Sequence, residues 1–176
     1  PVFDEFPEHA IDLGLPSGTL WADRNVGADS PEGYGGYYAW GETEEKESYT
    51  WENYKYLNSA SESFINIGSN ICGTTYDVAH VEWGEGARMP THNEFEELLQ
   101  YCSKNRTTEG FDFIGPNGNK INLPLAGGKE YTLFGTNEYA YYRSGSQYID
   151  SEYYEEDDVY CLLFEDEWYI DPDQSR

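Results

Sequence analysis

Basic residues and aliphatic residues are both scarce in this sequence. Its 176 residues include 10 Lys and Arg against 34 Asp and Glu, which gives a formal net charge of −24 at pH 7. Leu, Ile, Val and Phe together supply only 32 residues. These two scarcities are typical of disordered chains. The 17 Tyr, 8 Phe and 5 Trp indicate the opposite, because aromatic rings can build a core where aliphatic side chains are few. We therefore expect a folded domain.

The scarcity of positive charge and of apolar runs also limits the partners. A chain with a pI of about 4.1 repels phosphate groups, so we expect no nucleic-acid partner. No run approaches the ~18 apolar residues of a membrane helix, and no segment is both basic and amphipathic, so we expect no direct membrane insertion. The chain starts at Pro1 without an initiator Met or a signal peptide, and we expect a mature or excised fragment that forms one domain over residues 1–176.

Cysteine is scarce as well. Cys72, Cys102 and Cys161 are compatible with one disulfide and a leftover thiol, or with three free thiols. Their spacing matches no zinc pattern, and the three histidines are too far apart in the sequence to form a paired helical site. We expect buried or free thiols without chemistry and no histidine-based metal site.

Local patterns predict an α+β fold. Thr91 followed by Glu94 forms a capping box, and the apolar stripe after it predicts a helix that reaches Cys102. A shorter helix is predicted from Tyr76 to Trp83, before Gly84. Two antiparallel hairpins follow: residues 111–114 with 120–125 around a Pro-Asn-Gly turn, and residues 159–164 with 168–170.

Three segments carry a family resemblance: residues 10–28, which contain Leu-Pro-Ser-Gly-Thr-Leu-Trp-Ala, residues 34–43, which contain Tyr-Ala-Trp-Gly-Glu-Thr, and residues 83–95, which contain Arg-Met-Pro-Thr. Together they resemble the Fibrobacter succinogenes major paralogous domain, a family of bacterial secreted and surface-lipoprotein modules. The third segment also resembles the Arg-Leu-Pro-Thr signature of the formylglycine-generating-enzyme superfamily. The resemblance implies a C-type-lectin-like fold, with two helices flanking a twisted antiparallel sheet with long loops, and a secreted or cell-surface location.

The sequence departs from both families in the last part of the chain. Members of the first family continue past the position of Arg176 into a closing strand, so we expect that strand to be lacking here and an open sheet edge in its place. The paired catalytic cysteines of the formylglycine-generating enzymes are not matched, because Cys161 stands alone in its segment. We therefore expect no enzyme activity of that type.

Acidic and aromatic residues concentrate in the last quarter of the chain. Eleven acids fall between positions 150 and 173, where no Lys or Arg occurs, and nine of the 17 Tyr lie between positions 131 and 169. Carboxylates on loops are the ligands that calcium prefers, although acidic runs are more often a solvated face. Calcium is thus a possible cofactor, and its weak candidate ligands are Asp150, Glu152, Asp171 and Asp173.

The same segment is the best candidate for ligand binding. Tyr and Trp provide rigid, amphipathic surface for proteins and for sugar rings, and Arg143 can orient a carboxylate or a carbonyl. We expect a non-catalytic, adhesin-like extracellular module that binds a protein or glycan through its C-terminal loops. A structural spacer in a larger surface lipoprotein and an enzyme are the alternatives. The predicted ligand-binding residues are Tyr141, Arg143, Tyr148, Asp150, Tyr153, Tyr154, Trp168 and Tyr169.

Overall fold

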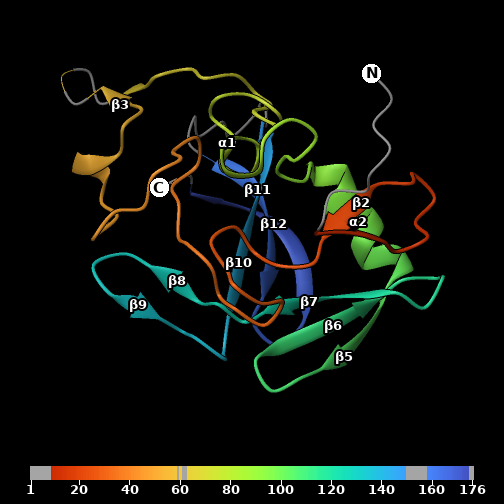
Figure 1. Cartoon of the computed structure of the whole chain (residues 1–176). Coiled ribbons are helices and arrows are strands. Elements are labelled where there is room, and N and C mark those ends of the chain that lie inside the picture. The colour runs from red at the N-terminus through yellow and green to blue at the C-terminus, as the bar shows by residue number, and fades with distance from the viewer. Residues whose placement is uncertain (1–8, 59, 61–62, 150–157, 175–176) are drawn as a thin grey trace.

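Helices and short antiparallel strands make up the regular structure of this chain (Figure 1). The structure is a computed structural model that describes residues 9–58, 60, 63–149 and 158–174. Within those ranges, the strands form two three-stranded and three two-stranded antiparallel sheets, and two α-helices accompany them. The predicted α+β class is confirmed.

The central sheet contains β10 (Ala140–Gln147), β11 (Asp158–Phe164) and β12 (Trp168–Gln174), in that order. It confirms the second predicted hairpin, although β12 runs past residue 170 to Gln174. Alternate residues of β11 face opposite sides of the sheet. Val159 and Cys161 are fully buried on one side and Leu162 on the other, so both faces of the sheet are covered.

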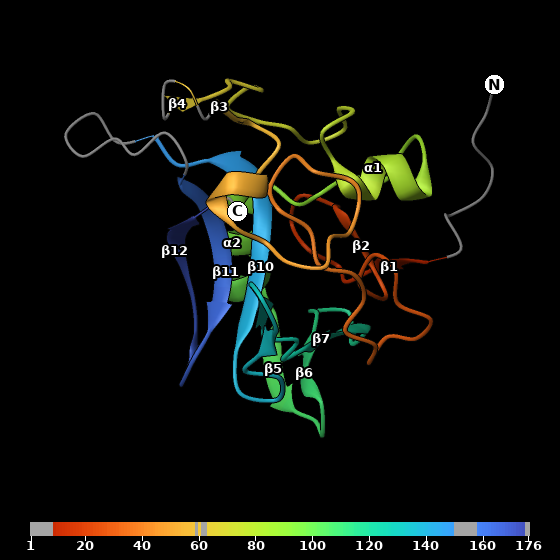
Figure 2. The ribbon, with the colours of Figure 1, turned by 90° about the vertical axis from the view of Figure 1, so that its left-hand side faces the viewer.

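Helix α2 (His92–Tyr101) covers one face of the central sheet, and Figure 2 shows it behind the strands. Thr91 is its N-cap and forms the predicted capping box with Glu94. Phe95 and Leu98 lie one turn apart on the apolar stripe and are buried against the sheet. The sequence prediction of this helix is confirmed.

Helix α1 (Val78–Trp83) is shorter than predicted, because Asp77 ends the preceding turn as the N-cap. The Asp77 carboxylate is fully buried and accepts hydrogen bonds from the backbone N–H groups of Gly73, His80 and Met89, at 2.8, 3.1 and 2.8 Å. These contacts join the start of α1 to the segment that leads into α2. The Asp77 side chain thus caps the N-terminus of α1 and holds the segment that leads into α2.

A second sheet, of β5 (Ser103–Arg106), β6 (Gly110–Ile114) and β7 (Lys120–Pro124), follows α2 and contains the first predicted hairpin. Its β6–β7 turn packs directly on the N-terminal part of the chain. A Cβ atom on Gly115 would lie 2.0 Å from the carbonyl oxygen of Leu13, so only glycine fits there.

The remaining regular elements are short and are joined by long loops. They are β1 (Ala10–Asp12), β2 (Leu20–Ala22), η1 (Trp51–Asn53), β3 (Leu57–Asn58), β4 (Ser63–Phe64), β8 (Gly128–Lys129) and β9 (Leu133–Phe134).

Loops as well as strands supply the core. One cluster, of Ala39, Tyr49, Tyr54 and Tyr56, is mostly aromatic and comes entirely from the segment before β3. This confirms that tyrosines take the place of aliphatic residues in the interior. Trp40, from the same segment, packs against Ile71 and the central sheet.

The structure resolves the state of the cysteines, which the sequence left open. Cys72, Cys102 and Cys161 are free thiols, and the last two are buried. Within the described ranges, no helix has the length and apolar character needed to cross a membrane.

Candidate functional site

The predicted C-terminal site does not form as one group of loop residues. Tyr141 and Arg143 lie on β10, paired with Leu163 and Cys161 of β11. Trp168 and Tyr169 lie on β12. Trp168 and Tyr169 thus lie on the strand predicted for residues 168–170. Tyr141 and Arg143 also belong to the central sheet, so these four residues are not part of a C-terminal loop surface.

Trp168 has the environment of a core residue. Its ring lies 5.2 Å from Phe113, 5.2 Å from Phe164 and 5.7 Å from Phe111, measured between ring centroids. Its Nε1 is buried and has no hydrogen-bond partner. This packing explains Trp168 without a ligand. Tyr169 similarly packs against the cluster around Val159.

Tyr148 follows β10 directly and takes part in a different aromatic stack. Its ring meets the edge of Tyr160 at a centroid distance of 5.3 Å, and Tyr160 lies flat on the His92 ring at 3.7 Å. Tyr148 therefore connects the end of β10 to the start of α2. It does not line the cleft described below.

The other predicted ligand-binding and calcium-binding residues fall into two groups. Asp150, Glu152, Tyr153 and Tyr154 lie outside the described residues. Asp171 is exposed on β12, and its backbone pairs with Cys161. Asp173 lies two residues further along the same strand. Within the described ranges, no three His, Cys, Asp or Glu side chains come close enough to hold a metal ion.

The structure instead contains a large cleft formed mainly by the first half of the chain. Its volume is about 940 Å³, within the usual range for small-molecule sites. The walls come from the loops around β2, from α1 and the segment into α2, from β7 and from β10. Tyr141 and Arg143 lie in the last of these walls, so two predicted residues belong to the cleft.

Aromatic side chains dominate the lining of the cleft. The Tyr37 hydroxyl donates to the Ala126 carbonyl oxygen at 2.6 Å, and the Tyr49 hydroxyl donates to the Tyr37 carbonyl oxygen. These bonds hold their rings in fixed positions. The aromatic residues that line the cleft are Trp21, Tyr34, Tyr37, Tyr38, Tyr49, Trp83, Phe95, Tyr141 and Tyr142.

Tyr38 packs against the backbone of Gly36 within this lining. A Cβ atom on Gly36 would lie 2.4 Å from the Tyr38 hydroxyl oxygen, so the ring packs directly over the glycine backbone. Partial burial, together with nearby negative charge, raises the pKa of Tyr38 above its ordinary value. The hydroxyl therefore stays protonated at neutral pH and keeps a proton to donate.

Tyr142 and Asn25 support the floor of the cleft. The Tyr142 hydroxyl donates to the Pro124 carbonyl oxygen at 2.7 Å and accepts from Asn25 Nδ2 at 3.3 Å. Asn25 Nδ2 also donates to the Tyr34 carbonyl oxygen at 3.0 Å. Burial raises the pKa of Tyr142 well above its ordinary value, so this phenol stays neutral. One strand residue thus positions the loop that carries Tyr34 and Tyr38.

Positive charge gathers at the cleft. Four of the ten Lys and Arg residues line it, against three of the 34 acids. The four cations are Arg24, Arg88, Lys129 and Arg143, and the three carboxylates are Glu82, Glu85 and Glu94. In a protein of net charge −24, the cleft is therefore close to electrically balanced.

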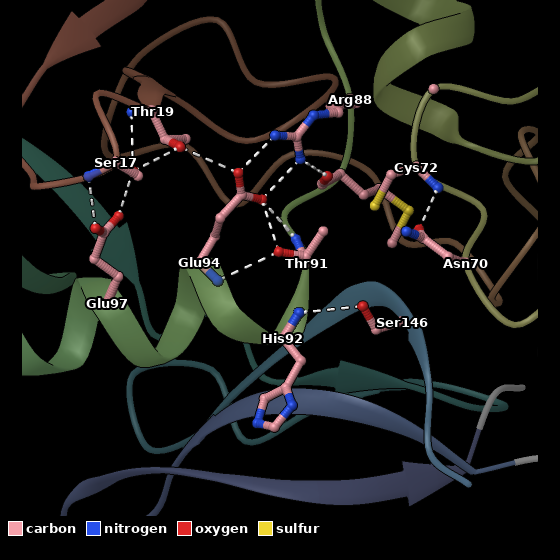
Figure 3. A network of polar contacts seen from close by, with 12 residues as sticks. Ser17, Thr19, Asn70, Cys72, Arg88, Thr91, His92, Glu94, Glu97 and Ser146 are labelled. Carbon is pink, nitrogen blue, oxygen red and sulfur yellow. Dashed lines mark hydrogen bonds and ion pairs between the residues drawn. The ribbon is translucent and has the colours of Figure 1, made fainter.

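Arg88 and Glu94 form the strongest charge pair of the cleft wall (Figure 3). Arg88 donates to both carboxylate oxygens of Glu94, at 2.5 and 2.7 Å, in a bidentate arrangement. Burial alone would raise the pKa of Glu94, but the hydrogen bonds from Arg88 and from the Thr91 backbone outweigh it and lower that pKa to about 2. Glu94 also accepts from the Thr19 hydroxyl at 3.2 Å, which ties the β2 loop to α2.

Trp21, which belongs to the cleft lining, has an indole N–H without a hydrogen-bond partner. Its ring lies 5.9 Å from Phe95, and both residues belong to the lining. The Trp21 Nε1 atom is buried and has no hydrogen-bond partner in the structure. Trp168 Nε1 in the core is unpaired in the same way, so this atom by itself does not indicate a ligand.

Only indirect patterns in the sequence pointed to the residues of this cleft. Tyr34–Thr43 and Arg88–Thr91 stood out as family-like segments, but the capping box explained Thr91 and Glu94 without a ligand. The structure confirms that capping role and adds that Glu94, together with Arg88, lines the cleft. Tyr37, Tyr38 and Tyr49 lie on loops without periodicity, so no sequence pattern could have shown that they converge.

Comparisons with known proteins add no relative. No family model matches the chain, and no curated protein and no solved structure matches it. The interpretation of the cleft therefore depends on its geometry and chemistry.

Proposed function

We propose that this protein is a non-catalytic binding module whose cleft holds a neutral oligosaccharide. The observation that carries the proposal is the combination of aromatic walls and balanced charge in a cleft of about 940 Å³. The site therefore lies mainly in the first half of the chain, and Tyr141 and Arg143 contribute to it.

The lining suits a sugar for two reasons. Aromatic rings offer flat apolar faces to the C–H groups of a sugar ring, and the hydroxyls of Tyr34, Tyr37, Tyr49 and Tyr142 are bonded within the protein, which fixes several of these rings in position. The cations of the cleft are largely engaged by the protein itself, as in the Arg88–Glu94 pair and the bond from Lys129 Nζ to the Lys46 carbonyl oxygen at 2.8 Å. An uncharged polar ligand fits this environment better than an ion.

The state of Glu94 supports binding rather than acid catalysis. A general acid needs a carboxyl group whose pKa lies near the working pH. The Glu94 pKa of about 2 keeps this carboxylate ionised and paired with Arg88. We assign Glu94 a structural role, in which it connects Arg88 and the β2 loop to helix α2.

We further propose that the fold is C-type-lectin-like and that the protein acts outside the cell. A helix against an antiparallel sheet, with long loops that carry the binding residues, supports this fold. The family-like segments 10–28, 34–43 and 83–95 lie in or beside the cleft walls. Secretion or display at the cell surface rests on that resemblance.

A glycan array tests the proposed function. The purified protein is applied in calcium and in EDTA, beside a Tyr38→Ala variant. We expect binding to neutral glycans that the variant loses by about ten-fold or more, because Tyr38 lines the cleft. A Tyr101→Ala variant is the matched control, because Tyr101 is 44% exposed on α2 and lies outside the cleft.

The array also separates the alternatives. Equal loss in both tyrosine variants, or no binding by the folded protein, would contradict the proposal and favour a spacer role. Loss of binding in EDTA alone would show that the site requires calcium.

A further inference from the structure

We infer that the binding site continues out of the cleft over an aromatic platform formed by the exposed Phe134 and Tyr139 and the half-buried Tyr141. The ligand is then an oligosaccharide chain contacted at several sugar units, rather than a single terminal sugar. This inference rests on the proposed function and specifies its ligand.

The platform is the most apolar part of the described surface near the cleft. Phe134 is 42% exposed and Tyr139 is 37% exposed, and the neighbouring Tyr131 and Leu133 are 73% and 48% exposed. They lie on and just after the β8–β9 hairpin, which projects beside β10 in Figure 1. A group of exposed apolar side chains beside a cleft is a common feature of ligand-binding surfaces.

Tyr141 makes the platform continuous with the cleft. It lines the cleft, and its ring centroid lies 6.1 Å from that of Phe134 and 6.5 Å from that of Tyr139. Tyr34 provides a second connection, because its hydroxyl donates to Asn137 Oδ1 at 3.1 Å and it also lines the cleft. A ligand that leaves the cleft over Tyr141 therefore meets the other two rings next.

Glycines hold the outer rings in place. A Cβ atom on Gly128 would lie 2.6 Å from the Phe134 ring, and a Cβ atom on Gly135 would lie 2.5 Å from the Tyr139 ring. Each ring is thus packed closely against a bare stretch of backbone. Such exposed but fixed rings bind with little loss of conformational entropy, which is typical of a recognition surface.

The charges around the platform favour a neutral chain over an acidic one. The hairpin carries Lys129 and Glu130 side by side, and Glu138 precedes Tyr139. Lys129 Nζ is engaged by the Lys46 carbonyl oxygen, so its charge is partly used within the protein. The net charge of −24 disfavours an approaching polyanion, while an uncharged polysaccharide is not repelled.

Short and long sugars of the same series test the platform. Affinities are measured by titration calorimetry for cellobiose and cellohexaose, maltose and maltohexaose, and chitobiose and chitohexaose. We expect at least one hexasaccharide to bind about ten-fold or more tightly than its disaccharide. In a Phe134→Ala/Tyr139→Ala variant this advantage is lost, while the affinity for the disaccharide stays the same.

The controls separate each failure. A Leu133→Ala variant removes an exposed aliphatic side chain from the same hairpin and should keep the advantage of the long sugar. Thermal unfolding confirms that each variant is folded. Equal affinity for long and short sugars, or an unchanged advantage in the double variant, overturns the platform but leaves the cleft proposal intact.

Two further outcomes are decisive. If no sugar of the three series binds, the proposed function fails together with the platform. If the double variant instead abolishes a concentration-dependent self-association, measured by analytical ultracentrifugation, and leaves sugar affinity unchanged, the platform is a protein interface and the inference is wrong.

Discussion

Glu94 performs two tasks with one carboxylate. It completes the capping box of α2 with Thr91, and it receives both donors of the Arg88 guanidinium. Its side chain is only 13% exposed, so the ion pair is better shielded from solvent than a surface pair. The Glu94 carboxylate therefore stabilises both the N-terminus of α2 and the cleft wall that contains Arg88.

This sharing predicts an acid-dependent loss of stability. The pKa of Glu94 is about 2 in the folded protein against an ordinary value of 4.5, so its contribution is complete above about pH 4.5 and is lost as pH falls towards 2. Urea unfolding across this window measures the effect. We expect the Glu94→Gln variant to be less stable by about 1–3 kcal/mol at pH 7 and to differ less from the wild type at pH 3.

A Glu96→Gln variant is the matched control, because Glu96 is an exposed carboxylate on the same helix. It should leave the free energy of unfolding nearly unchanged at both pH values. The assignment fails if the difference between the wild type and Glu94→Gln is the same at pH 7 and pH 3.

At the level of elements, the β6–β7 turn contains two glycines that are required for different reasons. Gly115 has no room for a side chain, because a Cβ atom would lie 2.0 Å from the Leu13 carbonyl oxygen. Gly118 has open space around it but a φ of 88°, in the left-handed region. One position depends on tertiary packing and the other on local conformation.

Alanine substitutions distinguish the two causes. We expect Gly118→Ala to lower the free energy of unfolding by about 1 kcal/mol, the usual cost of a left-handed alanine. Gly115→Ala should cost more, about 2–3 kcal/mol, because the turn and the Leu13 segment must separate. Urea denaturation of the two variants measures both values, and equal costs would contradict the packing role of Gly115.

The sequence predicted the elements that have strong local signals. Helix α2 has a capping box and an apolar stripe, and both C-terminal hairpins have strand patterns on either side of a turn. The short pairs β1–β2, β3–β4 and β8–β9 have no such pattern, because each strand has only two or three residues.

The candidate site was harder to predict than the fold. Aromatic composition indicated recognition, and two of the predicted residues, Tyr141 and Arg143, do line the cleft. The count of tyrosines could not separate core from surface, however, and Trp168 proved to be packed among other rings. Convergence of Tyr34, Tyr38 and Trp83 depends on loop paths that only tertiary structure defines.

At the scale of the whole molecule, the dominant feature is self-repulsion. A net charge of −24 on 176 residues disfavours any compact state, and salt reduces this penalty by shortening the range of the repulsion. Raising the ionic strength from about 0.01 M to 0.15 M reduces the Debye length from about 30 to 8 Å.

We expect the melting temperature to rise over that range of salt by about 3 °C, which corresponds to about 1 kcal/mol for a domain of this size. Differential scanning calorimetry in sodium chloride measures the change, and potassium chloride should give the same result because the effect depends on ionic strength. A constant or falling melting temperature would show that specific ion pairs outweigh the overall repulsion.

The loop origin of the core has an evolutionary consequence. In most proteins, surface loops accept substitutions and insertions more freely than the elements that they join. Here the segment between β2 and β3 supplies Trp40, Tyr49 and Tyr54 to the interior, so lengthening or shortening it would disrupt the core. A lineage that acquires a new ligand at this wall of the cleft would therefore exchange single side chains, such as Tyr38, within a segment of fixed length.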